Sequence, residues 1–112
     1  MHDVEAGSLD RDEGDQAQPV KGGRVSVALC TYNGAQYLKE QLESIASQTV
    51  LPYELVVCDD CSSDDTVAIL KVFAGRVSFL VRVVVNREKL GSTKNFEQAI
   101  RLCEGDLIVL SD

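Results

Sequence analysis

The sequence predicts an α/β fold in which a parallel sheet carries helices on both faces. Short apolar runs alternate with segments whose apolar residues recur at helical spacing, in the order β-α-β-α-β-α-β. Alternation at this spacing is typical of right-handed crossovers between parallel strands. The second strand is a continuous apolar run, which is expected when both faces of a sheet are covered. With 112 residues, the chain has room for one small domain.

The first half of the chain contributes two strands and the helix between them. Residues 24–29 form an apolar run that predicts a short buried strand. A helix is predicted over 35–47, because leucine and isoleucine recur there at i, i+4 and i+7. Pro52 closes the connection, and residues 54–58 form the second strand.

A second helix is predicted to begin beside the second strand. Ser62 or Ser63 is expected to cap it. Asp64 and Asp65 would then lie in its first turn, where the positive end of the helix dipole favours carboxylates. Gly75 is expected to end this helix.

The remaining elements are a strand, a loop, a helix and a final strand. Residues 77–85 predict the third strand, and 86–91 form a loop. A third helix is predicted over about 92–102, with Gly105 ending it, and the fourth strand follows over 107–110. The apolar face of this helix is predicted to hold Phe96, Ala99, Ile100 and Cys103.

The acidic charge is concentrated at the beginning of the chain. The net charge is −7, and residues 1–20 hold six acidic side chains against Arg11 alone. Such a segment, poor in large apolar residues, cannot offset the entropy of ordering. We therefore expect a disordered acidic leader over 1–22, with an acidic interaction arm as the alternative, and a folded part over 23–112.

The folded part is nearly neutral and its basic residues are scattered, so no nucleic-acid partner is expected. No stretch approaches the roughly 20 apolar residues of a membrane span. The N-terminus also lacks the apolar region of a signal peptide. We expect a cytoplasmic protein without a transmembrane segment, whose four cysteines are free thiols.

Polar residues follow three of the predicted strands. Cys30-Thr31-Tyr32-Asn33-Gly34 follows the first, Asp59-Asp60-Cys61-Ser62-Ser63-Asp64-Asp65-Thr66 follows the second, and Asp112 follows the fourth. In a parallel α/β sheet, ligands bind outside the carboxyl ends of the strands. Taken alone, each of the first two runs can also be an ordinary turn, with its Asp or Asn residues capping a helix.

Several α/β chemistries are excluded by the residues present. The first turn lacks G-x-G-x-x-G, and no P-loop occurs. A Ser-His-Asp set is not available, since His2 is the sole histidine. Carboxylate chemistry with a metal remains, and Asp59, Asp60 and Asp112 are hard oxygen ligands that suit Mg²⁺ or Mn²⁺.

Taken together, four blocks of the sequence resemble family-2 nucleotide-sugar glycosyltransferases. The blocks are Val25–Gly34, Ser47–Thr49 with Glu54–Thr66, Asn86 with Gly91 and Lys94-Asn95 (the N-x(4)-G-x(3)-N pattern), and Glu104–Asp112. They occur in the family's order and cover 24–112. Leu90–Glu97 is also similar to bacterial enzymes that build surface polysaccharides, rhamnosyltransferases among them.

The resemblance implies a GT-A fold, Rossmann-like, and transfer with inversion from a UDP- or dTDP-linked sugar. By position, Thr31 and Tyr32 would contact the nucleobase, with the Tyr32 ring as packing surface. Asp60 would accept the ring N–H of uracil or thymine, with Asn33 and Asp59 in the same nucleotide-sugar site. Cys61 stands where the family usually has Gly, so a positive φ there would carry strain.

The resemblance also assigns the diphosphate and metal positions. Lys94 would face the diphosphate, and Asp112 matches the first Asp of the D-x-D motif that holds Mg²⁺ or Mn²⁺. The catalytic base and the half that binds a glycan or lipid-linked acceptor would lie beyond residue 112. We therefore expect a truncated, donor-binding part that is inactive alone, from a cytoplasmic enzyme working at the inner membrane face.

Two other interpretations compete with the transferase. Cys58-Asp59-Asp60-Cys61 is a C-x-x-C, and with Cys30 it could support a zinc or redox module. A zinc site wants four ligands, and the helical spacing of Cys103 favours a core position instead. The chain could also be a non-catalytic remnant that binds nucleotide or nothing.

Overall fold

A computed structural model describes residues 23–111 of the chain. The leader expected over 1–22 and the expected position of Asp112 lie outside the described residues. Strands and helices alternate strictly in the described part. They are β1 (Val25–Thr31), α1 (Ala35–Ala46), β2 (Glu54–Asp59), α2 (Thr66–Arg76), β3 (Leu80–Val85), α3 (Ser92–Leu102) and β4 (Leu107–Ser111).

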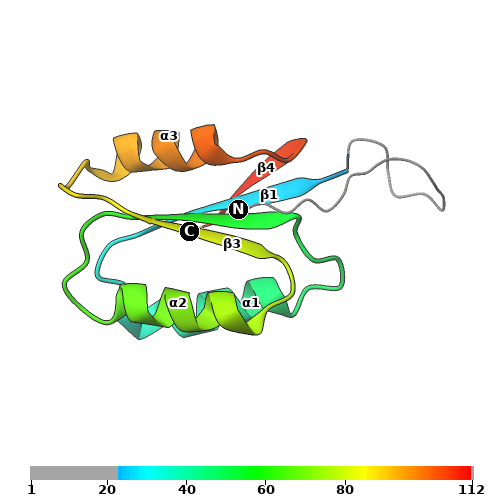
Figure 1. Cartoon of the computed structure of the whole chain (residues 1–112), viewed down its shortest axis with the longest axis horizontal. Helices are drawn as coiled ribbons and strands as arrows, with labels where there is room; N and C mark the ends of the chain where they lie inside the picture. The colour runs from blue at the N-terminus through cyan, green and yellow to red at the C-terminus, as the bar shows by residue number, and fades with distance from the viewer. Residues whose placement is uncertain (1–22, 112) are drawn as a thin grey trace.

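The four strands form one parallel sheet in the order β3-β2-β1-β4. Helices α1 and α2 cover one face of the sheet, and α3 covers the other (Figure 1). The predicted α/β architecture is therefore confirmed. The chain first moves outward from β1 to β3 and then crosses to the other side of β1. This reversal makes the region between β1 and β4 a topological switch point, where open α/β sheets bind ligands.

Apolar residues form a separate core on each face of the sheet. The larger core lies under α1 and α2 and contains Val27, Leu29, Leu38, Leu42, Ile45, Leu55, Val57, Leu70 and Phe73. The smaller core lies under α3 and contains Ala28, Cys58 and Ala99. Every residue of β2 is buried because the strand has a neighbour on each side and helices on both faces. The continuous apolar pattern of 54–58 thus has the expected cause.

The start of α2 differs from the sequence-based expectation. The helix begins at Thr66 rather than just after Ser62 or Ser63, and Asp65 is its N-cap residue. Asp64 precedes the helix and accepts hydrogen bonds from the backbone N–H of Thr66 and, across the loop, of Ala35. Its carboxylate thus satisfies the N–H groups of two helices, which a pattern within one helix cannot reveal.

Smaller differences concern element ends and one helix face. Gly75 lies inside α2, which continues to Arg76, and β3 begins at Leu80 rather than at residue 77. On α3 the buried residues are Asn95 and Ala99, whereas Ile100 is exposed. The predicted apolar face of that helix was therefore wrong in part, because a polar residue with internal partners takes one of its core positions.

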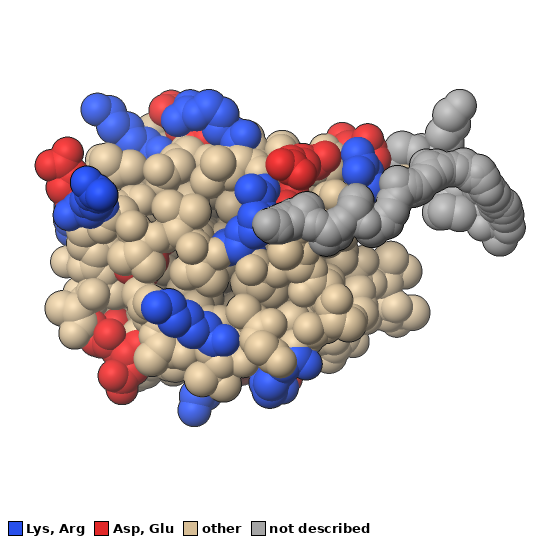
Figure 2. Space-filling model, in the orientation of Figure 1, with Lys and Arg blue, Asp and Glu red and all other residues tan. Residues whose placement is uncertain are grey.

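The surface carries mixed charges. On the face shown in Figure 2, basic and acidic side chains are interspersed around an area that is largely uncharged. Among the described residues, no helix is both long and apolar enough to cross a membrane.

Candidate functional site

The carboxyl ends of β1 and β2 lie side by side, so the polar runs that follow them meet. Thr31 is the register partner of Asp59, and its hydroxyl donates to an Asp59 carboxylate oxygen at 2.6 Å. The same carboxylate accepts from the backbone N–H of Ser62 at 2.9 Å and from the Ser62 hydroxyl at 2.6 Å. Asp59 is fully buried. Its contacts hold the two loops in place, which sets the position of the next residue, Asp60.

The loop after β1 is tied to the loop after β2 by further hydrogen bonds. The backbone N–H of Asn33 donates to the Ser62 hydroxyl at 2.7 Å, and the Asn33 amide oxygen accepts from the backbone N–H of Ser63 at 2.8 Å. Asn33 has a φ of 49°, a left-handed conformation that Asn tolerates better than most residues. The amide of Asn33 is thus directed into the neighbouring loop, where it braces the turn that carries Tyr32.

Asp60 is held by hydrogen bonds at the same edge of the sheet. Its carboxylate accepts from the backbone N–H groups of Leu90 at 2.7 Å and Gly91 at 2.9 Å. The side-chain amide of Asn86 donates a third hydrogen bond at 3.0 Å. The hydrogen bond from Leu90 is the largest cause that lowers the pKa of Asp60, while burial works in the opposite direction. Asp60 is therefore an ionised carboxylate at neutral pH, although only 3% of its surface is exposed.

A network of side-chain amides fixes Asn86, which is one of the three donors to Asp60. Asn86 also donates to the side-chain oxygen of Asn95 at 2.8 Å. Asn95 donates in turn to the backbone oxygen of Cys58 at 2.8 Å, and Gln98 donates to Asn86 at 2.9 Å. Asn86 and Asn95 are the two asparagines of the N-x(4)-G-x(3)-N pattern. Their function in this fold is to fix the loop before α3 against the end of β2.

Gly91 completes this support because of its backbone conformation. Its φ is 91° and its ψ is 158°, a region that is essentially restricted to glycine. A Cβ atom at this position would meet nothing within 4 Å. The glycine is therefore required by the backbone angle rather than by lack of space, and this angle aims its N–H at Asp60.

Tyr32 presents an accessible ring next to this carboxylate. The residue is 49% exposed. The Lys89 ammonium lies over the Tyr32 ring, with Nζ 3.7 Å from the ring centroid. Lys89 also lowers the pKa of Asp60 through its charge. An open aromatic ring, a carboxylate and an ammonium thus occupy one edge of the sheet, which is a suitable combination for a flat polar ligand.

Cys61 follows Asp60 with a φ of 68°. The family usually has glycine at this position, and the backbone does adopt a positive φ here. Cys61 therefore carries the strain of a left-handed conformation. Its thiol donates to the backbone oxygen of Asn86 at 3.1 Å, which attaches this turn to the same loop that holds Asp60.

The cysteines do not form the arrangement that a zinc or redox module needs. All four thiols are free. Burial is the main cause that raises the pKa of Cys30 to about 12, and it raises the pKa of Cys58 as well. Within residues 23–111, no group of three or more His, Cys, Asp and Glu side chains could hold a metal ion. Nothing in the described part of the chain favours the C-x-x-C interpretation.

Two predicted residues stand apart from this cluster. Lys94 lies in the first turn of α3, exposed to solvent, three residues after Gly91. Asp112 lies outside the described residues, but Ser111, which precedes it, is the register partner of Leu29 in β1. The described end of β4 therefore points toward the edge of the sheet that carries Thr31 and Asp59.

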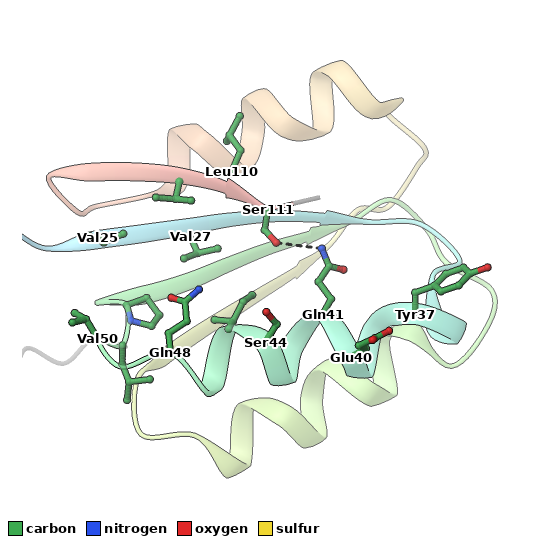
Figure 3. Close-up of a pocket in the computed structure, with 14 residues that line it drawn as sticks. Val25, Val27, Tyr37, Glu40, Gln41, Ser44, Gln48, Val50, Leu110 and Ser111 are labelled. Carbon is green, nitrogen blue, oxygen red and sulfur yellow. Dashed lines mark hydrogen bonds between the residues drawn. The ribbon is translucent and has the colours of Figure 1, made fainter.

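A cavity of about 830 Å³ lies between α1 and strands β1 and β4, and neither Asp60 nor any of its hydrogen-bond donors lines it. Figure 3 shows Val25, Val27 and Leu110 on the strands and Gln41 and Ser44 on the helix lining it. The Gln41 amide donates to the Ser111 hydroxyl at 3.2 Å across this cavity. None of the sequence-predicted site residues lines it, so its volume alone does not locate the chemistry.

The sequence analysis missed the residues that hold Asp60 and cover Tyr32. Leu90 contributes through its backbone N–H, which no side-chain pattern can reveal. Asn86, Gly91 and Asn95 were noted as a spacing, and that spacing was the available signal for their joint role. Lys89 carried no signal in the sequence, since one lysine in a polar loop has no distinguishing pattern.

Comparison with known proteins identifies the family of the chain. Residues 26–112 match the family described as glycosyl transferase family 2. The chain is 33% identical over 91 residues to EpsE of Bacillus subtilis (strain 168), a protein that is named as a glycosyltransferase. The aligned region covers 81% of this chain and 33% of EpsE.

Solved structures show the same fold. TarS residues 1–349 of S. aureus, in complex with UDP-GlcNAc, gives a TM-score of 0.70 at 31% identity over 78% of this chain and 25% of that one. The mannosyltransferase PcManGT of Pyrobaculum calidifontis, in complex with GDP-Man and Mn²⁺, gives 0.69 at 29% identity over 76% and 26%. These matches bear out the expected GT-A architecture. The chain spans a quarter to a third of these relatives, and it belongs to glycosyltransferase family 2.

Proposed function

We propose that this chain is the donor-binding part of an inverting glycosyltransferase. In this proposal, the edge of the sheet that carries Asp60 and Tyr32 binds the base of a UDP- or dTDP-linked sugar. The observation that carries the proposal is the buried, ionised Asp60 beside the accessible ring of Tyr32. In support, a structural relative is known in complex with UDP-GlcNAc. The following steps give the role of each residue.

Asp60 is suited to accept one more hydrogen bond from a ligand. A carboxylate offers about four acceptor positions, and protein donors occupy three of them at Asp60. A ring N–H of uracil or thymine would occupy the fourth. Cytosine has no proton on the corresponding ring nitrogen, so it would leave this fourth acceptor position without a donor, which is costly in a buried place. The proposed site therefore selects bases with a ring N–H.

Tyr32 and Thr31 would complete the base site. The half-exposed Tyr32 ring offers a flat apolar surface on which a base can pack, at a cost of few ordered side chains. Thr31 keeps Asp59 and the loop of Tyr32 in position through its hydrogen bond. In this proposal Asn33 and Asp59 act by positioning, since their side chains are directed to protein partners.

The diphosphate and its metal would be held next to this site. Asp59 and Asp60 already accept several protein hydrogen bonds each, so neither is free to act as a principal metal ligand. We assign Mg²⁺ or Mn²⁺ to Asp112, which follows β4 in the sequence. We assign to Lys94 a position that faces the diphosphate. A bound metal would neutralise the charge that develops on the leaving diphosphate. A structural relative is known in complex with Mn²⁺.

In this proposal, the complete reaction also uses a base and an acceptor site that are not assigned to the described residues. The proposal places the base that deprotonates the acceptor hydroxyl outside these residues, with a polysaccharide or lipid-linked glycan as acceptor. A cytoplasmic enzyme at the inner membrane face that builds surface polysaccharide, of the rhamnosyltransferase kind, is part of the proposal. The chain alone is then expected to bind donor weakly and to be inactive.

Titration calorimetry of the chain tests the base site. UDP, dTDP, CDP, ADP and GDP are compared in Mg²⁺ or Mn²⁺, and GDP is informative because guanine also carries a ring N–H. We expect UDP and dTDP to bind at least tenfold more tightly than CDP, since a site built for one hydrogen bond rejects analogues that lack it. Asp60→Ala should remove this preference.

A matched control is Asp65→Asn, which alters an exposed carboxylate that makes no capping hydrogen bond. It should leave UDP binding unchanged. Equal affinity for all five nucleotides, or unchanged UDP affinity in Asp60→Ala, would refute the proposal and favour the non-catalytic remnant.

A further inference from the structure

The outer side of helices α1 and α2 carries a hollow that the proposed base site does not use. A cavity of about 560 Å³ lies between these helices, which run side by side over one face of the sheet (Figure 1). Neither Tyr32 nor Asp60 lines this cavity. We call the surface around it the α1–α2 face. Its apolar lining consists of Leu42 on α1 and of Ala68, Ile69, Val72 and Phe73 on α2.

Val72 projects from this face. The residue is 67% exposed although it lies in the middle of α2, whereas Leu42 and Phe73 are almost fully buried. One surface therefore presents an exposed apolar side chain and, beside it, a recess with apolar walls. In a dimer with two-fold symmetry both subunits use the same patch, so such a patch has to fit itself. A projection next to a recess meets this requirement.

Four charged side chains also line the cavity, and they alternate in sign. The two helices run in the same direction, since each connects consecutive strands of the parallel sheet. Toward their beginnings are Lys39 on α1 and Asp65, the N-cap residue of α2. Toward their ends are Glu43 on α1 and Arg76 on α2, which form an ion pair. All four residues are exposed, and their charges sum to zero.

This alternation makes the face complementary to a copy of itself. Two copies can meet with α1 against α2 of the partner, the helices running the same way. Lys39 then faces the partner's Asp65, and Glu43 faces the partner's Arg76. Alternatively each helix meets its own counterpart in the opposite direction, so that Lys39 faces the partner's Glu43 and Asp65 faces the partner's Arg76. Opposite charges oppose each other in both arrangements.

We propose that the α1–α2 face is a homodimer interface, in which Val72 of each subunit packs into the recess of the other. The apolar contact supplies the affinity, because exposed ion pairs contribute little. The alternating charges supply specificity, since like charges that face each other are costly. A face without net charge offers no attraction to a nucleic acid or an anionic membrane, which favours a second copy as the partner. The inference does not rest on the proposed function.

Charge variants test the pairing by sedimentation velocity over a range of concentrations. The acidic variant carries Lys39→Glu and Arg76→Glu, and the basic variant carries Glu43→Lys and Asp65→Asn. Asparagine is used at residue 65 because it is a favoured N-cap residue, whereas a positive charge at the beginning of a helix is unfavourable. Each variant alone should dimerise at least about tenfold more weakly than the unmodified chain. An equimolar mixture should recover dimers that contain one copy of each variant.

A matched pair of valine substitutions tests the location of the interface. Val72→Lys and Val109→Lys each replace an exposed valine, one on α2 and the other on the edge strand β4. Val72→Lys should weaken dimerisation at least about tenfold, because it removes the apolar projection. Val109→Lys should dimerise as the unmodified chain does, since β4 lies outside the α1–α2 face. Circular dichroism checks that every variant keeps its fold.

Three results would overturn this interface. The first is an unmodified chain that stays monomeric at millimolar concentration. The second is a pair of charge variants that each self-associate as strongly as the unmodified chain, or whose mixture associates no more strongly than either variant alone. The third is a dimer that is lost in Val109→Lys and kept in Val72→Lys, which would place the contact on β4 instead.

Discussion

Two buried carboxylates lie at opposite ends of β2, and their surroundings differ in a way that separates folding from function. Glu54 begins the strand and Asp60 follows it. Glu54 is fully buried and accepts from the Ser26 hydroxyl at 2.6 Å, from the backbone N–H of Glu104 at 2.6 Å and from the Arg82 guanidinium at 3.1 Å. Asp60 also accepts three hydrogen bonds, but all three donors are neutral.

The contacts of Glu54 connect distant parts of the chain. Arg82 also donates to the backbone oxygen of Leu102, and the backbone N–H of Gly105 donates to the Ser26 hydroxyl at 2.8 Å. A Cβ atom at Gly105 would lie 2.6 Å from that hydroxyl oxygen and 2.8 Å from the backbone oxygen of Arg24. The charge of Glu54 is thus neutralised inside the protein, and the group fixes the turn between α3 and β4.

The contacts of Asp60 leave its charge available. It has no guanidinium partner, and the nearby groups are the exposed ring of Tyr32 and the movable Lys89. The comparison teaches that burial and hydrogen bonding alone do not identify a functional carboxylate. The distinguishing feature is an incomplete set of partners at an edge that a ligand can reach.

Removing the charge of Glu54 should have the largest effect on stability. Glu54→Gln removes a fully buried charge from the partly buried Arg82 guanidinium, which is 29% exposed. Breaking one partner of a buried pair costs about 3–5 kcal/mol, and the exposure of Arg82 favours the lower end of that range. Urea unfolding followed by circular dichroism gives the free energy of unfolding. The control is Glu43→Gln, which breaks the exposed Arg76–Glu43 pair and should cost less than about 1 kcal/mol. Equal costs for the two variants would contradict the structural role of Glu54.

A pair of glycine substitutions should give effects of opposite sign. Gly91→Ala forces alanine into a region with φ of 91° and should reduce the free energy of unfolding by about 1–3 kcal/mol. It should also weaken UDP binding, since the N–H of residue 91 holds Asp60. Gly75→Ala lies in α2, where a Cβ meets nothing within 4 Å, and should stabilise the chain by up to about 1 kcal/mol. Thermal unfolding and UDP titration measure both, and a neutral Gly91→Ala would remove the backbone argument.

The smallest expected effect is that of mild acid on uridine binding. The pKa of Asp60 is lowered below its ordinary 3.8, mainly by the Leu90 hydrogen bond. A carboxyl group with a lowered pKa in the folded state stabilises that state above the ordinary pKa and loses this contribution as pH falls through the lowered one. Uridine affinity should therefore stay constant from pH 8 to about pH 5 and decline only in stronger acid. Calorimetry across this range checks it, and a midpoint above pH 5 would mean that burial outweighs the hydrogen bonds.

The sequence by itself determined the order of elements and the parallel sheet. Helical spacing and continuous apolar runs are local signals, and they placed every described strand and helix to within a few residues of its observed ends. The spacing of Asn86, Gly91 and Asn95 matched the N-x(4)-G-x(3)-N pattern of the family, without assigning these three residues a role. Local signals failed at Asp64 and on the face of α3. There, hydrogen bonds to residues distant in sequence outweigh the local preference of the side chain.

Only the tertiary structure decided which of the adjacent carboxylates faces a ligand. Asp59 and Asp60 are adjacent residues of the same type, but successive residues at the end of a strand point in different directions. One is therefore enclosed by Thr31 and Ser62, and the other reaches the loop of Leu90 and Gly91. The position of Lys89 over Tyr32 likewise depends on two loops separated by most of the described chain. Such contacts arise from the packing of parallel strands, which brings the ends of β1, β2 and β3 to one edge.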